Sequence, residues 1–404
     1  MKLEEILPQI AAGVPATCLA PMQDVTTCRF MELIAGERYG APDFFVTEFL
    51  RVHATSDFND EIVESLTRIP ARAPLFLQLI GENIDALTRV AGAALSRFGS
   101  VAGIDFNLGC PSPKICKKNV GGGLLRDIAH VAEIIPALRE ITADRGKLFS
   151  VKCRIGFADD SALSRIVDLA NENAVDLLSV HGRTVRGLYR TPVDYGAIAF
   201  AVEKAACPVF ANGEISSVVK SKFVLATTKC AGFMLGRHAI RNPWIFRQIK
   251  EARERGFYGN NAAPTNPIPT TNPILTTNLI PTTNPSSTTN PRSTTNPVAT
   301  TNPAPEIFRP TLGDVFLYVR DLAECVAQPG DNPERVAARM KKFLNFVGTG
   351  VDARGEFLFE ARRAKTPDEI FAVSEKFMLA GNRAEQPFPD EPFSGIVARP
   401  NCEI

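Results

Sequence analysis

The sequence predicts an α/β fold: a (β/α)8 barrel followed by a smaller all-helical C-terminal domain. Between about residues 16 and 236, eight short apolar runs alternate with longer segments of helical pattern. Eight strands within roughly 250 residues are typical of this barrel. A doubly wound sheet is the weaker alternative, because no GxGxxG motif follows the first run. The expected strands are Thr17–Met22, Phe44–Thr47, Leu75–Ile80, Gly103–Asn107, Phe149–Arg154, Leu177–His181, Pro208–Asn212 and Cys230–Gly236.

Most of these runs end in a residue that can take part in chemistry or recognition. In a parallel barrel the carboxyl ends of the strands meet on one face, and active sites lie there. We therefore expect one shared face for Met22, Glu48, Gln78, Asn107, Lys152, Arg154, His181, Asn212 and Arg237.

The stretch 107–125, NLGCPSPKICKKNVGGGLL, follows the fourth run and has the composition of a loop. Cys110 lies at the mouth of the strand, in a loop with three lysines, where a thiol can meet a substrate. A structural, half-buried thiol is the alternative. Cys116 is the rival in the same loop, whereas Cys153 lies within a strand and alternation points it away from its neighbours.

Composition limits the classes of protein that fit. The chain has 404 residues, of which 45% are hydrophobic and 22% charged, as in soluble globular proteins. A net charge of +1 gives no global attraction to nucleic acid. Nine cysteines without CxxC spacing indicate neither a disulfide framework nor a metal site. No membrane span and no leader segment are recognisable, so we expect a reducing, cytoplasmic location.

The composition also divides the chain into four parts. Residues 1–255 hold the barrel. Residues 256–306 contain a TTNPxx repeat with a period of six and are expected to form a disordered linker; a β-solenoid is the alternative. Residues 307–384 show helical patterns, and the tail 385–404 is expected to lack structure. The expected C-terminal helices are Leu312–Ala327, Pro333–Val347, Ala353–Ala361 and Pro367–Leu379.

A basic stripe accompanies the apolar face of the second of these helices. Arg335, Arg339 and Lys342 share one side of 333–347, next to the side that packs. The stripe fits contacts to phosphates, and a solvated surface explains the pattern about as well.

Several strand ends fit a phosphate-tailed redox ring. ANGEI (211–215) and MLGR (234–237) follow the last two strands, where barrels commonly bind phosphate. Lys152 can place a positive charge beside a cofactor that becomes anionic on reduction, and Gln78 can bond the edge of a flat heterocycle. His181 can reach the phosphate or the substrate. Together they predict FMN; a buried ion pair is the alternative role for Lys152.

The motifs taken together resemble the tRNA-dihydrouridine synthases. They cover nearly the whole barrel in the family's order: APM (20–22), TEF (47–49), QLIG (78–81), NLGCPSP (107–113), GGGLL (121–125), VKCRIGF (151–157), VHGRT (180–184), ANGEI and LGR (235–237). TEFLRV (47–52) and the triple glycine look most like the C-type bacterial branch. The Thr/Asn/Pro repeat departs from the family, which joins its two domains by a short connection.

The resemblance implies an activity and a set of residue roles. In this family NADPH reduces the flavin, the flavin passes hydride to C6 of a uracil in the tRNA D-loop, and a cysteine gives the proton to C5. The matching acid is Cys110, and the C-type branch implies position sixteen of tRNA. We expect a monomer. The implied FMN residues are Pro21, Met22, Gln78, Lys152, His181, Asn212, Gly213, Glu214, Gly236 and Arg237, and the implied tRNA-binding residues are Glu48, Asn107, Arg154, Arg335, Arg339 and Lys342.

Two other functions share parts of this pattern. An FMN enzyme that acts on a free pyrimidine or dihydroorotate would use the same barrel but would not need the helical domain. A non-catalytic RNA-binding protein would carry no flavin.

Overall fold

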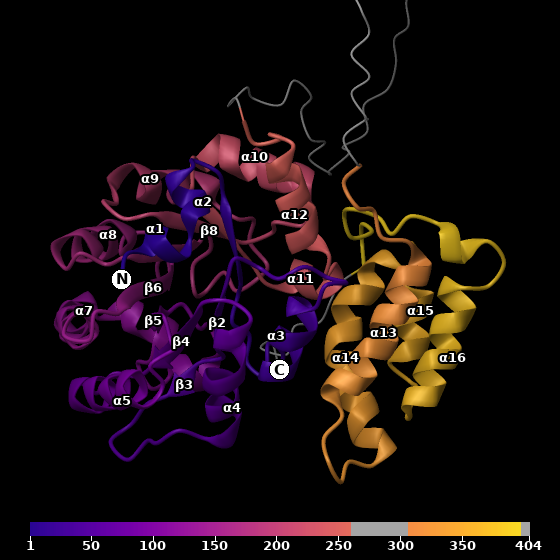
Figure 1. Ribbon diagram of the computed structural model, residues 1–404, viewed down its shortest axis with the longest axis horizontal. Coiled ribbons are helices and arrows are strands. Elements are labelled where there is room, and N and C mark those ends of the chain that lie inside the picture. Colours follow the sequence, from indigo (N-terminus) through magenta and orange to yellow (C-terminus); the bar gives the residue numbers. More distant parts are fainter. Residues whose placement is uncertain (260–305, 397–404) are drawn as a thin grey trace, which may run out of the picture.

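The computed structural model describes residues 1–259 and 306–396 and shows a closed parallel barrel (Figure 1). Strand β1 pairs with both β2 and β9, and β2 also pairs with β4. Both β2 and β3 pair with β4 and together occupy one position in the barrel, so the nine strands fill eight positions. The expected (β/α)8 barrel is confirmed. The strands are β1 Ala16–Leu19, β2 Phe44–Val46, β3 Leu50–Arg51, β4 Leu75–Ile80, β5 Gly103–Leu108, β6 Leu148–Arg154, β7 Leu177–His181, β8 Val209–Asn212 and β9 Gly232–Leu235.

Helices surround the strands and present one apolar face to them (Figure 1). Side chains accept a hydrogen bond from the first turn of several of these helices, as Asn83 does at α5 and Asp194 at α9, which satisfies amides that a helix start leaves unpaired. The longer barrel helices are α3 Cys28–Ala35, α4 Asp60–Arg68, α5 Ile84–Arg97, α7 Ile128–Ala143, α8 Leu163–Glu172, α9 Tyr195–Lys204, α10 Val218–Thr228 and α12 Ile245–Glu254. Short ones are α1 Leu3–Ile6, α2 Pro8–Ala11, α6 Pro113–Cys116 and α11 Arg237–Arg241.

The C-terminal helices form a second body beside the barrel, orange to yellow in Figure 1. Helix α14 packs on α3 through the rings of Phe343 and Phe30, whose centroids lie 5.1 Å apart. The hydroxyl of Tyr318 donates to the carbonyl of Ile240 at 3.0 Å, which ties α13 to α11. The expected helical region is confirmed as α13 Leu312–Val326, α14 Pro333–Val347, α15 Glu356–Ala361 and α16 Pro367–Met378.

The tail after α16 differs from expectation. Residues 385–396 were expected to lack structure, yet Phe388 is buried and the guanidinium of Arg241 donates to the carbonyls of Asp390 and Glu391 at 3.0 and 2.9 Å. The buried ring and these hydrogen bonds hold the segment on the barrel. Most of the expected linker, 260–305, and the end of the tail, 397–404, lie outside the described residues. Within the described ranges, no helix is both long and apolar enough for a membrane span.

Candidate active site

The carboxyl ends of four neighbouring strands bring the expected polar residues together. Strand pairing places Asn107 of β5 opposite Lys152 of β6. It also places Arg154 opposite His181 of β7, and His181 opposite Asn212 of β8. Because paired residues in a parallel sheet are direct neighbours, these side chains share the mouth of the barrel.

Cys110 lies at this mouth, two residues beyond β5, and is partly exposed. The side-chain oxygen of Asn107 accepts hydrogen bonds from the backbone N–H groups of Gly109 and Cys110, both at 2.9 Å. A single amide oxygen therefore fixes the turn that carries the thiol. Its position agrees with the predicted role of proton donor.

The triple glycine lies against the backbone of Cys110. The amide of Gly122 donates to the carbonyl of Cys110 at 3.1 Å. A Cβ at Gly122 would lie 2.7 Å from that carbonyl oxygen and 2.6 Å from a methyl of Val185. Gly121 has φ +58°, which non-glycine residues rarely adopt. Glycine is thus required at these positions, because any side chain would push this segment away from the backbone of Cys110.

The rival thiol, Cys116, makes a hydrogen bond within the protein. It is buried, and its sulfur lies 3.3 Å from the carbonyl oxygen of Cys110, where the S–H donates. Burial raises the pKa of Cys116. The geometry gives Cys116 a supporting position and leaves Cys110 as the candidate acid.

Lys152 is a buried cation at the same mouth. It is 9% exposed, and burial, followed by the charge of Arg154, lowers its pKa. Among residues 1–259 and 306–396 its ammonium has no hydrogen-bond or ion-pair partner, although the charge of Asp105 partly offsets the shift. A buried ammonium without a partner is unfavourable, so this site fits an anionic or hydrogen-bond-accepting ligand.

Arg154, which is predicted to contact the substrate, also makes several hydrogen bonds within the protein. The side chain is 1% exposed, and it donates to the carbonyl of Gly109 at 3.1 Å and to those of Thr184 and Leu188 at 2.8 Å each. Since these carbonyls belong to two different loops, the guanidinium holds the cysteine loop against the loop after β7.

Arg183 is a residue of the site that the sequence analysis did not single out. It is buried beside His181, forms an ion pair with Glu214, and its Nη1 lies 3.4 Å from Nε2 of His181. Burial, then the charge of Arg154, lowers the pKa of His181 well below its usual value. His181 is therefore neutral at pH 7. The signal available was its place in HGRT, two residues after a strand-end histidine.

The end of β8 adjoins His181, and the ends of β9 and β1 follow it around the barrel. Asn212 donates to the carbonyl of Met234 at 2.7 Å, which leaves its side-chain oxygen for other contacts. Gly213 has φ +124°, and a Cβ there would lie 3.1 Å from the ring of His181. A Cβ on Gly236 would lie 3.4 Å from the sulfur of Met22.

The remaining predicted cofactor residues divide into partly exposed and buried ones. Arg237 lies over the ring of Tyr189, 4.2 Å from its centroid, and Pro21 is partly exposed. Gln78 has no exposed surface, and its amide bonds Asn107 and Asp105. The predicted contact of Gln78 with a flavin would use the second hydrogen of its side-chain nitrogen or the second lone pair of its side-chain oxygen.

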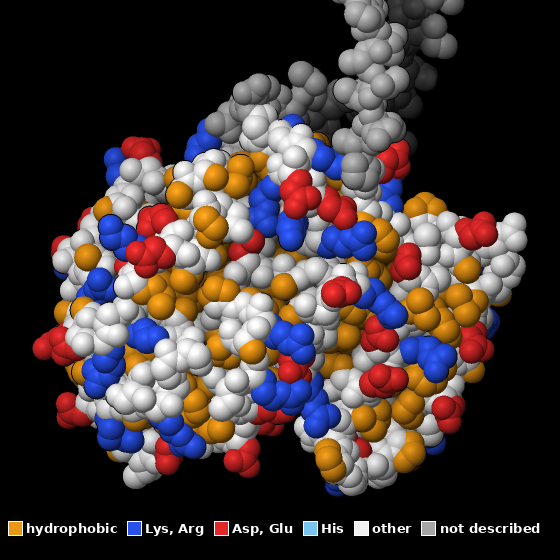
Figure 2. All heavy atoms as spheres, viewed as in Figure 1, with side chains coloured by type: hydrophobic (Ala, Val, Ile, Leu, Met, Phe, Trp, Pro, Cys, Tyr) orange, Lys and Arg blue, Asp and Glu red, His pale blue; other side chains and the backbone are white. Residues whose placement is uncertain are grey.

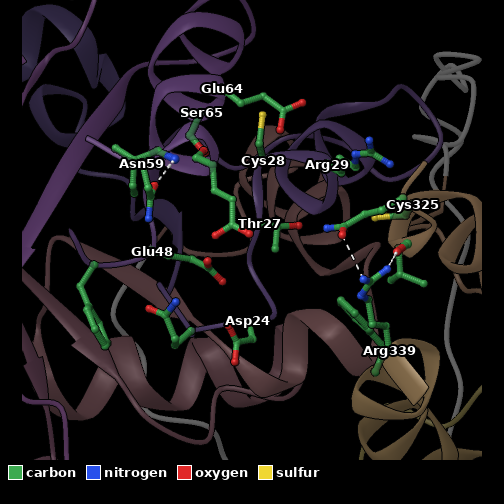
Figure 3. A pocket seen from close by; sticks show the side chains of 17 residues that line it. Asp24, Thr27, Cys28, Arg29, Glu48, Asn59, Glu64, Ser65, Cys325 and Arg339 are labelled. Carbon is green, nitrogen blue, oxygen red and sulfur yellow. Dashed lines mark hydrogen bonds between the residues drawn. The ribbon is translucent and has the colours of Figure 1, made fainter. Parts of the chain in front are cut away.

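Glu48 lies to one side, in a pocket between the barrel and the C-terminal helices (Figure 3). The carboxylate is 8% exposed and accepts from the amide of Val25 at 3.0 Å. Burial raises the pKa of Glu48 to about 7. The pocket also contains Asp24, Arg339 and the ring of Phe343.

Replacing Glu48 with glutamine is expected to stabilise the protein above neutral pH. Between pH values of about 4.5 and 7 the folded protein keeps a proton that the unfolded chain has released, so the free energy of unfolding falls as pH rises through that window. Glutamine removes this loss, on the order of 3 kcal/mol. Urea unfolding at about pH 8 and about pH 5 measures it; the gain should appear only at the higher pH.

Glu61, an exposed carboxylate of the same pocket, gives the control for this measurement. Glu61→Gln should change stability little at either pH. An equal gain for both variants would show that general charge removal, rather than burial of Glu48, causes the effect.

The three basic residues of α14 have different surroundings. Arg335 is exposed. Arg339, in contrast, forms an ion pair with Asp331 and donates to the carbonyl of Val326 at 3.0 Å. The sequence pattern suggests a basic side chain free to contact a phosphate, whereas this guanidinium already has partners within the protein. Lys342 lies 3.8 Å from Asp24 of the barrel, which it reaches across the junction. Only part of the expected stripe is thus open to a phosphate.

The chain is similar to one protein family, to several named proteins and, more weakly, to solved structures. Residues 18–267 match the family described as "Dihydrouridine synthase (Dus)". The chain is 35% identical to a "Probable tRNA-dihydrouridine synthase" of Helicobacter pylori over 57% of this chain and 69% of that protein. It is 34% identical to "tRNA-dihydrouridine synthase B" of Pseudomonas putida over 59% and 68%. Among solved structures, histamine dehydrogenase from Rhizobium sp. 4-9 aligns with 59% of this chain and 46% of its own, at 14% identity and a TM-score of 0.45. The chain belongs to the dihydrouridine synthase family.

Proposed function

We propose that this protein reduces a uridine in the D-loop of tRNA to 5,6-dihydrouridine, with FMN as its redox group and NADPH as the reductant. One observation carries the proposal: a partly exposed thiol, Cys110, is held at the same barrel mouth as the buried ammonium of Lys152. Family membership and the names of the relatives support it.

The residues at the strand ends fit FMN. The ammonium of Lys152 has no partner among the described residues and suits the polar edge of a flavin ring. Gly213 and Gly236 leave room for close approach after β8 and β9, and Arg237 supplies a positive charge for a phosphate. When bound, FMN supplies the hydride that adds to C6 of the uracil.

Cys110 completes the reaction by giving a proton. The C5–C6 double bond of uracil is conjugated to the C4 carbonyl, so addition of hydride at C6 leaves an enolate-like negative charge that reaches C5. A thiol with a pKa of about 8.5 keeps its proton at neutral pH, and it can transfer that proton to C5. The new C5–H bond forms as the S–H bond breaks.

The surface around the mouth suits a folded RNA. A stacked uridine must leave its stack to reach the thiol, so the protein has to hold the surrounding RNA. Lys114, Lys117 and Lys118 are exposed beside Cys110. On the face shown in Figure 2, further Lys and Arg side chains gather where the barrel meets the C-terminal helices. These charges supply contacts to phosphates.

Arg335→Gln is expected to weaken tRNA binding in a salt-dependent manner. Loss of one phosphate contact should reduce the slope of log K against log salt by about 1 and leave kcat unchanged. Binding titrations at several salt concentrations measure the slope. Arg363→Gln, an exposed arginine after α15, is the control and should keep the wild-type slope. Equal slopes for all three proteins would remove Arg335 from the interface.

The activity is tested with the purified full-length protein, unmodified tRNA and NADPH, by measuring dihydrouridine formed. We expect a flavin absorbance in the purified protein and a much higher kcat/KM for tRNA than for free uridine or dihydroorotate. A preference for the free pyrimidine would favour a small-molecule oxidoreductase on the same barrel. A colourless protein that binds tRNA without turnover would favour a non-catalytic RNA-binding protein.

Finer assignments follow from fewer residues. We assign the chain to the C-type branch from TEFLRV (47–52) and the triple glycine, and therefore expect reduction at position sixteen of tRNA. Some relatives carry the letter B in their names. Mapping dihydrouridine in tRNA from a deletion strain decides between the branches. We further propose a cytoplasmic monomer, with catalysis in 1–255 and tRNA binding in 307–384.

A further inference from the structure

A fully buried carboxylate lies beneath the cysteine loop. Asp105, in the middle of β5, is 1% exposed, and no role follows for it from the proposed reaction. The hydroxyl of Ser150 donates to one of its oxygens at 2.6 Å, and the side-chain nitrogen of Gln78 donates to the other at 2.6 Å. Its two partners come from β6 and β4, the strands on either side of β5.

A chain of hydrogen bonds runs from this carboxylate to the thiol loop. The side-chain oxygen of Gln78 accepts from the side-chain nitrogen of Asn107 at 2.8 Å. The side-chain oxygen of Asn107 then accepts from the amides of Gly109 and Cys110, both at 2.9 Å. The three side chains that form it, Asp105, Gln78 and Asn107, are all buried.

Chemistry fixes the direction of every bond in this chain. A carboxylate can only accept, so Gln78 must present its NH2 to Asp105 and its oxygen to Asn107. Asn107 must then present its NH2 to Gln78 and its oxygen to the loop. The two backbone N–H groups of the loop can only donate, so they require the same orientation from the other end. Both ends therefore agree, and no amide in the chain can flip without losing hydrogen bonds in a buried place.

We propose that Asp105 is a positioning residue: through Gln78 and Asn107 it sets the turn at Gly109 and Cys110, and so directs the thiol at the substrate. The hydrogen-bond chain itself is independent of the reaction, whereas the effect on turnover rests on the proposed function. An apolar residue at 105 would fill the space but would leave the amide of Gln78 without its acceptor. The loop would then lose its fixed anchor.

The positioning role requires a hydrogen-bond acceptor at position 105, not a negative charge. Two substitutions, one that keeps an acceptor and one that removes it, should therefore have different effects. In Asp105→Asn the side-chain oxygen can face Gln78 while the nitrogen faces the hydroxyl of Ser150, so the chain survives. In Asp105→Leu a side chain of the same branched shape, with methyl groups in place of the two carboxylate oxygens, breaks the chain. We expect kcat on tRNA to fall about 100-fold in Asp105→Leu, with KM for tRNA unchanged, and less than about 10-fold in Asp105→Asn.

A second measurement does not depend on turnover. The amides of Gly109 and Cys110 are protected from hydrogen exchange by the oxygen of Asn107, so Asp105→Leu should speed their exchange about 5-fold or more, and Asp105→Asn should not. If the wild-type protein makes no dihydrouridine, the proposed function fails while the exchange rates still test the positioning. If the wild type is active and Asp105→Leu keeps its kcat and its exchange rates, the positioning role fails.

Two further variants cover the case in which Asp105→Leu does not fold. Gln78→Met breaks the same chain with an unbranched side chain of similar length, and the same accelerated exchange is expected. Ser150→Ala removes the other hydrogen bond to Asp105 and is compared with Ser179→Ala. Ser179 is a buried strand hydroxyl without a hydrogen-bond partner among the described residues. Exchange at Gly109 and Cys110 should rise only in Ser150→Ala; an equal rise in both serine variants, or none in Gln78→Met, would overturn the proposal.

Discussion

Replacing Cys110 with alanine is expected to lower the rate of dihydrouridine formation about 100- to 10,000-fold, the usual range for losing a general acid. The thiol is partly exposed at the barrel mouth, whereas the other thiol of the same loop, Cys116, is buried and donates to the carbonyl of Cys110. Flavin content and KM for tRNA should remain at the wild-type values, because Cys110 is expected to protonate one carbon of the uracil and not to hold the flavin or the tRNA in place. Single-turnover reduction of unmodified tRNA measures the rate.

Cys116→Ala is the matched control for this prediction. Cys116 follows Cys110 by six residues, but it is buried and its S–H donates a hydrogen bond to the carbonyl of Cys110. Its replacement should therefore change the rate only a few-fold. A variant order in which Cys116→Ala is the slower enzyme would transfer the role of acid to Cys116.

The sequence was sufficient to predict the barrel and the face that carries the site. Alternation of apolar runs and helical segments predicted the strands, and strand pairing then placed Asn107 opposite Lys152 and Arg154 opposite His181. The break between β2 and β3 was not predictable. There the hydroxyl of Thr47 accepts from the backbone amide of Gln78, so a side chain replaces part of the strand ladder, which a hydrophobic pattern does not reveal.

Sequence patterns could not show which polar groups are already used inside the protein. Arg154 and Arg339 are predicted to bind the substrate, and no sequence pattern indicates that both also donate to backbone carbonyls. The carbonyl of Gly109 lies in the loop after β5 and that of Val326 at the end of α13, and only the tertiary structure brings them close to these arginines. The same reason hid Arg183, whose partner Glu214 lies on a different loop.

The packed tail shows a related limit. Residues from 385 onward are rich in proline and charge, which is typical of segments without structure. Its anchor is one buried ring, Phe388, with the guanidinium of Arg241 lying over it, 4.7 Å from the ring centroid. A single aromatic residue gives no periodic signal, so only the tertiary structure identifies it as an anchor.

Lys152→Met is expected to weaken FMN binding and, at the same time, to stabilise the flavin-free protein. Burial lowers the pKa of Lys152, which means that holding its charged ammonium inside the folded protein costs free energy relative to the unfolded chain, where the ammonium is solvated. Methionine keeps the length of the side chain and removes this unfavourable burial. The hydrogen bond from a charged group to the ligand is also lost, which should raise the Kd for FMN about 10- to 100-fold. Fluorescence titration of flavin-free protein measures the affinity, and thermal unfolding without FMN measures the stability.

Lys147 provides the opposite case at the other end of the same strand. Burial lowers the pKa of Lys147 too, but its ammonium donates to the carbonyls of Gly99 and Val101 at 2.6 and 2.7 Å. Because Lys147→Met would leave these carbonyls without a donor, it should lower the melting temperature and leave FMN affinity unchanged. Removing a structural lysine lowers the stability of the protein. Removing a lysine that is buried unfavourably in order to bind a ligand raises the stability of the ligand-free protein. If Lys152→Met also lost stability and kept its affinity for FMN, Lys152 would be a structural lysine, and the cofactor site would have to lie elsewhere on the barrel.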